Sequence, residues 1–260
     1  MTTSQPSPAA FARAYAHAVE RGAREIVSVH LSGELSGTVS AAGLAALAAP
    51  VPVHVVDSRS VAMGLGLAAV AAAELVAGSP AGGRRRPFPA AGFVAGPAGP
   101  AGPAGPARPA CPADGAAAAE RARQVAASTS IVFLVDSLEH LRRGGRMSAT
   151  AAAMGTVLGL RPLLALRSGR IEVAEKVRTR RAARERLEAL ALEALALKNL
   201  AGREGAQVCV HHLGQPELAL ALADRIRARP GVGEVSVSEI SAVLAAHAGP
   251  GLLAVVVADR

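Results

Sequence analysis

Aromatic residues are nearly absent from this chain of 260 residues. Phe, Tyr and Trp together make up 2% of it, as four Phe, one Tyr and no Trp. The net charge of +8 would attract anions of any kind, including nucleic acid. Proteins that bind single strands, however, interleave basic residues with aromatic rings on which the bases stack. We therefore expect no nucleic-acid partner. The alternative interpretation is a basic protein that binds anions or nucleic acid.

Cysteine is also scarce, since the chain has only Cys111 and Cys209. Two cysteines this far apart cannot form a disulfide framework, which indicates a reduced, cytoplasmic setting. The first residues lack the basic and apolar segments of a signal peptide. No apolar run is long enough to span a bilayer, so we expect no stable membrane insertion.

What the chain has in quantity is small and aliphatic side chains. Hydrophobic residues make up 51% of the sequence, so Ala, Leu and Val must fill any core. Residues 78–115 are different, because Gly, Pro, Ala and Arg dominate them and the triplet GPA repeats from Gly96 to Ala107. This composition predicts a flexible surface insertion.

Apolar residues recur at helix or strand spacing along the rest of the chain. Ser7 and Pro8 predict a helix start, Gly22 predicts its end, and Ser168 and Gly169 predict a hairpin turn. Strands are predicted at 25–31, 51–56, 130–136, 160–166, 170–175, 207–213, 235–239 and 252–258, and further helices at 38–47, 64–76, 116–127, 180–200 and 217–228. Strands that alternate with helices are typical of α/β proteins.

This pattern predicts two lobes. We expect an N-terminal α/β lobe with a parallel sheet over residues 1–127, which includes the insertion, and a C-terminal α/β lobe over residues 128–260. A cleft between two such lobes is a favoured place for a ligand.

Several patterns typical of catalytic or cofactor sites are incomplete. The GxGxxA stretch that begins at Gly64 lies too far beyond its strand for a dinucleotide site, and no GxxxxGK[ST] phosphate loop is present. His211 and His212 lack metal-ligand spacing, so we expect no metal or other cofactor. The segment from Gly33 to Gly37 is one residue out of the GxSxG pattern. A serine-dependent acyl hydrolase therefore remains an alternative.

Hydroxyl side chains gather in two loops, each at the start of a helix. Thr3 and Ser4 precede the first predicted helix, where free backbone N–H groups favour an anion. The second loop follows the strand at 25–31, and its candidate residues are Ser32, Ser36, Gly37 and Thr38. Such residues are better suited to hold an anion than to attack a substrate. The alternative is that they only cap helices.

Seven segments together resemble the DegV family of fatty-acid-binding proteins. They are TSQPSP (3–8), LSGELSGT (31–38), VVDSRSVAMGLG (55–66), LEHLRRGGRMS (138–148), LRPLLALRSGRI (160–171), EKVRTRRAARERL (175–187) and AAHAGPG (245–251). Their order and spacing agree over nearly the whole chain. The resemblance is therefore more specific than any single motif.

The resemblance implies a two-lobed α/β protein that holds one long-chain fatty acid in an internal tunnel between the lobes. In the family, a Thr and a Ser that correspond to Thr3 and Ser36 bind the carboxylate, and a His that corresponds to His247 lies near it. The resemblance also implies a non-catalytic protein that presents the carboxylate to a fatty-acid kinase, which converts it to an acyl phosphate.

Compared with the family pattern, this chain opens directly at its Thr-Thr-Ser-Gln segment. We therefore expect the first strand of the family's N-terminal lobe, and the loop that follows it, to be missing. Where family members often have two serines, this chain has Ser32 and Gly33, so one hydroxyl is expected to be lost.

Overall fold

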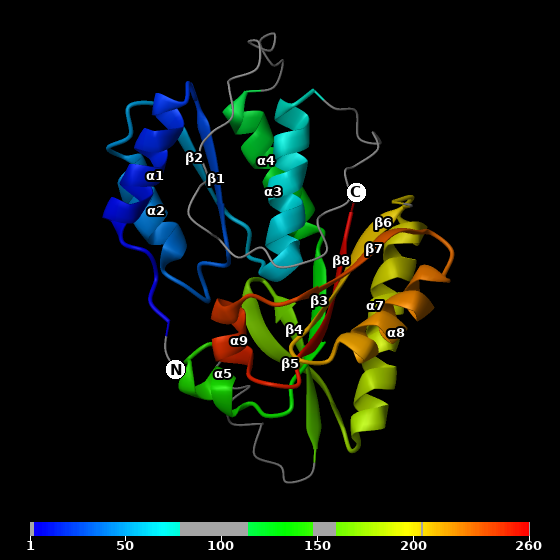
Figure 1. Ribbon diagram of the computed structural model, residues 1–260. Coiled ribbons are helices and arrows are strands. Elements are labelled where there is room, and N and C mark those ends of the chain that lie inside the picture. Colours follow the sequence, from blue (N-terminus) through cyan, green and yellow to red (C-terminus); the bar gives the residue numbers. More distant parts are fainter. Residues whose placement is uncertain (1–2, 79–113, 148–159, 204, 260) are drawn as a thin grey trace.

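The computed structural model describes residues 3–78, 114–147, 160–203 and 205–259 (Figure 1). Nearly all of the predicted insertion at 78–115 therefore lies outside the described residues. The described residues form two lobes with a mixed α/β fold, as predicted (Figure 1).

The N-terminal lobe contains a two-stranded parallel sheet with helices on both sides (Figure 1). Its elements are α1 (Pro8–Glu20), β1 (Ile26–His30), α2 (Thr38–Ala46), β2 (Val53–Asp57), α3 (Ala62–Val76) and α4 (Gly115–Ala127). The hydroxyl of Ser7 caps α1 by accepting the N–H of Ala10, and Gly22 follows the helix with a φ of +90°. Both ends of this helix were predicted, because capping residues act locally.

The C-terminal lobe is built on a six-stranded sheet in the order β5-β4-β3-β8-β6-β7. Its elements are β3 (Ser130–Leu134), α5 (Glu139–Arg143), β4 (Arg161–Arg167), β5 (Arg170–Val177), α7 (Arg180–Leu200), β6 (Ala206–His212), α8 (Pro216–Arg227), β7 (Val232–Glu239), α9 (Ala242–Ala248) and β8 (Leu253–Ala258). Only β6 and β7 pair in parallel, so the sheet is mixed. The predicted hairpin joins β4 to β5, and Ser168 and Gly169 have φ values of +49° and +83°.

Strand β8 lies in the middle of this sheet and all of its residues are buried. Its side chains alternate between two cores, as the period of two in a strand requires. Val255 and Val257 pack with α7 and α8, whereas Ala254 and Val256 belong to a core that also includes α3 and α4. This second core crosses from one lobe to the other, and the boundary between residues 127 and 128 remains our proposal.

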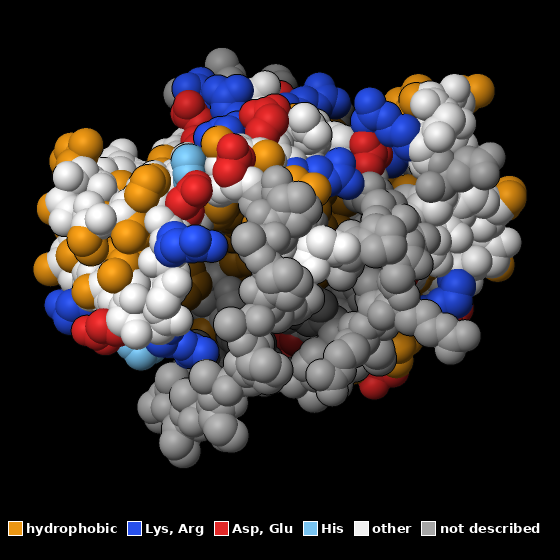
Figure 2. All heavy atoms as spheres, turned by 90° about the horizontal axis from the view of Figure 1, so that it is seen from above, with side chains coloured by type: hydrophobic (Ala, Val, Ile, Leu, Met, Phe, Trp, Pro, Cys, Tyr) orange, Lys and Arg blue, Asp and Glu red, His pale blue; other side chains and the backbone are white. Residues whose placement is uncertain are grey.

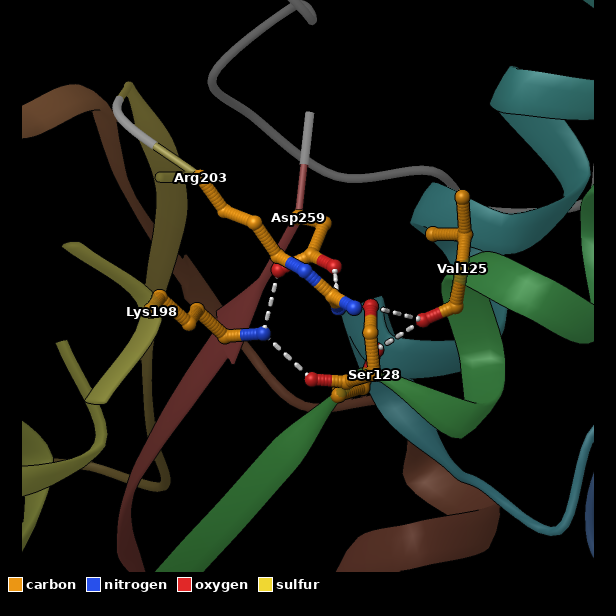
Figure 3. A network of polar contacts seen from close by, with 6 residues as sticks. Val125, Ser128, Lys198, Arg203 and Asp259 are labelled. Atoms are coloured by element: carbon orange, nitrogen blue, oxygen red, sulfur yellow. Dashed lines mark hydrogen bonds and ion pairs between the residues drawn. The ribbon is translucent and has the colours of Figure 1, made fainter. Parts of the chain in front are cut away.

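A polar network holds the end of α7 to β8 and to the start of β3 (Figure 3). The Nζ of Lys198, which is 7% exposed, donates to the carboxylate of Asp259 at 2.6 Å and to the backbone oxygen of Ser128. Arg203 donates to the other carboxylate oxygen. Burial raises the pKa of Asp259, but the hydrogen bonds and charge of Lys198 and the bond from Arg203 lower it overall. The carboxylate therefore stays charged and fixes three elements together.

Candidate functional site

A cavity of about 370 Å³ lies between the two lobes. One wall is the face of the six-stranded sheet opposite α7, and its side chains are Ile131, Phe133, Leu166, Ile171, Ala254 and Val256. The N-terminal lobe closes the cavity with residues 3–6, with the loop after β1 and with the start of α3. Most of the lining is apolar, which suits a ligand with a hydrocarbon body.

Several polar side chains of the cavity lining come from segments that contact one another, and this part of the lining is called its polar end. The hydroxyl of Thr3 lies 2.6 Å from Nε2 of His247, a contact that joins the N-terminal segment to α9. The hydroxyls of Ser36 and Thr38 lie 2.7 Å apart at the start of α2. These four side chains and that of Ser4 line the cavity. The structure thus brings together five of the seven residues that the sequence analysis singled out.

Arg146 adds a cation to this group, and the sequence analysis did not assign it to the site. It lines the cavity, and its Nε donates to the backbone oxygen of Leu35 at 3.1 Å. Burial lowers the pKa of His247, and the charge of Arg146 lowers it further. His247 is therefore neutral at pH 7 and can share a hydrogen bond. The signal for Arg146 was the basic run at 142–146, which composition alone could not separate from a solvated surface.

Local structure explains how the two hydroxyl loops face the same space. The backbone N–H groups of Leu35 and Ser36 donate to the oxygen of Ser32, so the loop after β1 turns back tightly toward α2. The side chain of Gln5 packs against Gly37, where an added Cβ would lie 2.0 Å from the Gln5 Oε1. The N-terminal segment therefore lies directly against the start of α2.

Ser32 and Gly37 do not line the cavity, unlike the other five candidates. The Ser32 hydroxyl is fully buried and donates to the backbone oxygen of Gly169 at 2.7 Å. Its only proton is used in that bond, so we leave Ser32 out of the proposed carboxylate-binding group. Gly37 contributes close packing against Gln5, since it has no side chain.

His211 also lines the cavity, and sequence reasoning considered it only as a metal ligand. The backbone N–H of Met63 donates to its Nε2 at 3.3 Å, which leaves Nδ1 to donate to the hydroxyl of Ser238 at 3.0 Å. Burial lowers the pKa of His211 to about 4. This imidazole is therefore a neutral, satisfied part of the wall.

Among the described residues, no group of three or more His, Cys, Asp or Glu side chains could hold a metal ion. Within the same ranges, every helix is too short or too polar to cross a bilayer.

The family model described as "Uncharacterised protein, DegV family" matches residues 1–79 and 113–260. The unmatched residues fall inside the Pro- and Gly-rich insertion. A DegV domain-containing protein of Streptomyces coelicolor is 46% identical, over 100% of this chain and 79% of the relative. Another, from Deinococcus radiodurans, is 34% identical over 98% of this chain and 76% of the relative.

Solved structures agree with these relatives. A fatty-acid-binding DegV family protein from Thermus thermophilus matches with a TM-score of 0.76 and 33% identity, over 100% of this chain and 79% of that one. DegV from Bacillus subtilis, described as a fatty acid binding protein, matches with a TM-score of 0.76 and 25% identity over the same shares of the two chains. A family match over most of the chain, together with these identities, shows that the chain belongs to the DegV family.

Proposed function

We propose that this protein binds a long-chain fatty acid in the cavity between its lobes, with the carboxylate at the end where Thr3 and Ser36 lie. The observation that carries the proposal is one cavity with an apolar wall and a polar end. The solved relatives from Thermus thermophilus and Bacillus subtilis are described as fatty-acid-binding proteins, which supports the same ligand class here.

The apolar wall supplies most of the affinity. Each methylene that leaves water contributes about 0.8 kcal/mol, so an acyl tail gains several kcal/mol from aliphatic walls alone. Aromatic side chains are not needed for this. The low aromatic content of the sequence is therefore compatible with a lipid site.

The polar end satisfies the carboxylate. A buried carboxylate without hydrogen bonds is very costly, and the hydroxyls of Thr3, Ser36 and Thr38 are placed to donate to it. When Nε2 of His247 carries the proton, it donates to the Thr3 hydroxyl, and that hydroxyl is then free to donate its own proton to the carboxylate. The Arg146 cation favours an anion at this end. Hydroxyls hold the carboxylate without transferring a proton to it.

The finer part of the proposal is presentation of the carboxylate to a separate fatty-acid kinase. Thr3, Ser36 and His247 are only half-buried, so a partner can reach a carboxylate held there. The chain has no GxxxxGK[ST] loop with which to hold ATP itself. Phosphorylation of the bound fatty acid would then require a second protein.

The alternative of a serine-dependent hydrolase has less support at this site. Ser36 hydrogen-bonds to Thr38, whereas His247 contacts Thr3. A serine does contact a histidine elsewhere, since Ser28 lies 2.7 Å from Nε2 of His30, but neither residue lines the cavity.

The alternative of nucleic-acid binding also has less support. Among the described residues on the face seen from above, Lys and Arg side chains are interspersed with Asp and Glu and do not form a continuous basic surface (Figure 2). Hydrophobic side chains are exposed at the left of that view, on the side where α1 and α2 lie in Figure 1.

The first test is uptake of palmitate by delipidated protein, followed by native mass spectrometry and calorimetry. We expect one fatty acid per chain. Thr3→Ala and Ser36→Ala should each weaken binding by about 1–3 kcal/mol, because each removes a partner of a buried anion. Ser7→Ala is the control, which should lower stability by about 1 kcal/mol through the lost helix cap and leave affinity unchanged. No uptake, or equal losses of affinity in all three variants, contradicts the proposal.

The second test concerns the kinase. With ATP and a fatty-acid kinase, the loaded protein should yield acyl phosphate, and without the kinase it should yield none. We also expect no turnover of acyl esters or thioesters by the protein alone. Turnover that Ser36→Ala abolishes would favour the hydrolase.

A further inference from the structure

Ser32 lies in the loop that carries Ser36, and its hydroxyl crosses to the other lobe. Ser32 has no exposed surface, and its hydroxyl donates to the backbone oxygen of Gly169 in the turn between β4 and β5. The same hydroxyl accepts the N–H of Glu34 at 3.2 Å. One buried group thus fixes the loop internally and joins it to the hairpin.

Two more contacts join the same loop to the C-terminal lobe. The Nε of Arg170, next to the hairpin turn, lies 2.8 Å from the Glu34 carboxylate. The Nε of Arg146 donates to the oxygen of Leu35. Residues 32–35 are therefore held at three successive points, immediately before Ser36.

The hairpin turn is shaped for this approach. Both turn residues have positive φ, as a two-residue type I′ turn requires, and Gly169 meets that need without strain. A Cβ at position 169 would lie 2.4 Å from the Ser32 hydroxyl. The turn can accept the Ser32 hydrogen bond only because residue 169 has no side chain.

We infer that the β4–β5 turn is a latch that positions Ser36 for the ligand, with Ser32, Glu34, Gly169 and Arg170 as its positioning residues. The latch holds the loop after β1 in one lobe to the hairpin between β4 and β5 in the other lobe. None of these four residues lines the cavity, so they act on the ligand only through the position of the loop that carries Ser36. The inference rests on the proposed carboxylate-binding role of Ser36.

The experiment combines two readouts on four variants. The variants are Ser32→Ala, Glu34→Arg, Arg170→Glu and the double reversal Glu34→Arg/Arg170→Glu. Palmitate affinity is measured by calorimetry, and amide hydrogen exchange of residues 33–38 is measured without fatty acid. Matched controls are Ser128→Ala, which removes another hydroxyl bond, and the exposed pair reversal Arg181→Glu/Glu185→Arg on α7.

We expect Ser32→Ala to weaken palmitate binding about tenfold and to speed exchange in 33–38, since it leaves the Gly169 oxygen without its partner. Each single reversal should weaken binding about threefold, as is usual for a partly exposed pair, and the double reversal should restore it. Neither control should change affinity. The Arg170 side chain is 61% exposed and that of Glu34 is 35% exposed, so we expect the reversal variants to fold even where Ser32→Ala does not.

The possible outcomes distinguish failure of the latch from failure of the proposed fatty-acid binding. Unchanged exchange in the Ser32→Ala and single-reversal variants overturns the latch, whatever the affinities are. A double reversal that binds no better than the singles overturns the role of the ion pair. Wild-type protein that takes up no palmitate overturns the proposed function instead, and the exchange data then decide the latch alone.

Discussion

The two faces of the six-stranded sheet are built from the same strands but pack against different partners. On one face, α7 and α8 contribute Leu187, Leu222 and Ile226, all buried, and they interlock with Val255 and Val257. The other face meets helices whose buried residues are mostly alanine, together with loops from the N-terminal lobe. Large side chains fill the first interface.

On the second face, the cavity of about 370 Å³ lies between the sheet and the N-terminal segment, the loop after β1, the start of α3 and α9. The buried alanines of α3 and α4 let these two helices pack closely against each other, and Ala62 is their one residue that lines the cavity. One face of the sheet is thus filled with large side chains that stabilise the fold, whereas the other borders the cavity in which we propose that the fatty acid binds. If the two faces have these separate roles, a substitution on the packed face should change stability but leave ligand affinity unchanged.

The largest effect is expected from filling the cavity. Ala254→Phe places a ring where the acyl tail would lie and displaces roughly five methylenes, a loss of about 4 kcal/mol of binding free energy at about 0.8 kcal/mol each. Calorimetry with palmitate measures the loss, and thermal unfolding checks that the variant is folded. A folded variant with wild-type affinity would show that the tail lies elsewhere.

A substitution on the face that packs against α7 and α8 should lower the stability of the protein and leave its affinity for palmitate unchanged. Leu187 is fully buried between α7 and the sheet, so Leu187→Ala should lower the free energy of unfolding by about 2–5 kcal/mol through lost burial and an unfilled cavity. Urea denaturation measures this loss. Palmitate affinity of the folded variant should remain that of the wild type, and a matching loss of affinity would argue against separate roles for the two faces.

The smallest effect concerns pH and His211 on the cavity face. Burial lowers the pKa of His211 to about 4 in the folded state, whereas it is about 6.5 in the unfolded chain. The unfolded state therefore binds the extra proton first, so stability is present above pH 6.5 and is lost as the pH falls. Between pH 7 and pH 5 this amounts to about 2 kcal/mol.

His211→Gln should remove that part of the pH dependence, although it also lowers stability at pH 7 because a buried hydrogen bond changes. Denaturant titrations of both proteins at pH 7, 6 and 5 give the comparison. If the two curves run parallel, His211 does not titrate as its burial requires.

The helices and strands followed from the sequence wherever the signal was local and long enough. Helix α7 was predicted over the residues it occupies, because 21 residues repeat an apolar face. The short helices α5 and α9 were missed, since five and seven residues are too few to show a period. The lobe after residue 128 was predicted as α/β, but its pattern did not indicate that most strands pair antiparallel.

Those parts of the candidate site that have a local signal in the sequence were also predicted. The hydroxyls of Thr3 and Ser36 precede helices, so their loops could be found from capping and strand patterns, and the family resemblance added His247. The place of Arg146 in the cavity lining and the hydrogen bond of Ser32 to Gly169 depend on contacts between distant segments. No local pattern in the sequence indicates such contacts.

Spacing, capping and composition act over a few residues, so they alone indicate most of the helices and strands, the aliphatic character of the interior and the two hydroxyl loops. Contacts between distant segments place β8 between β3 and β6, bring Thr3 to His247 and leave a cavity between the lobes. These features arise from packing segments as much as 244 residues apart. They depend on how the side chains of these distant segments fit together in space, which no local pattern in the sequence specifies.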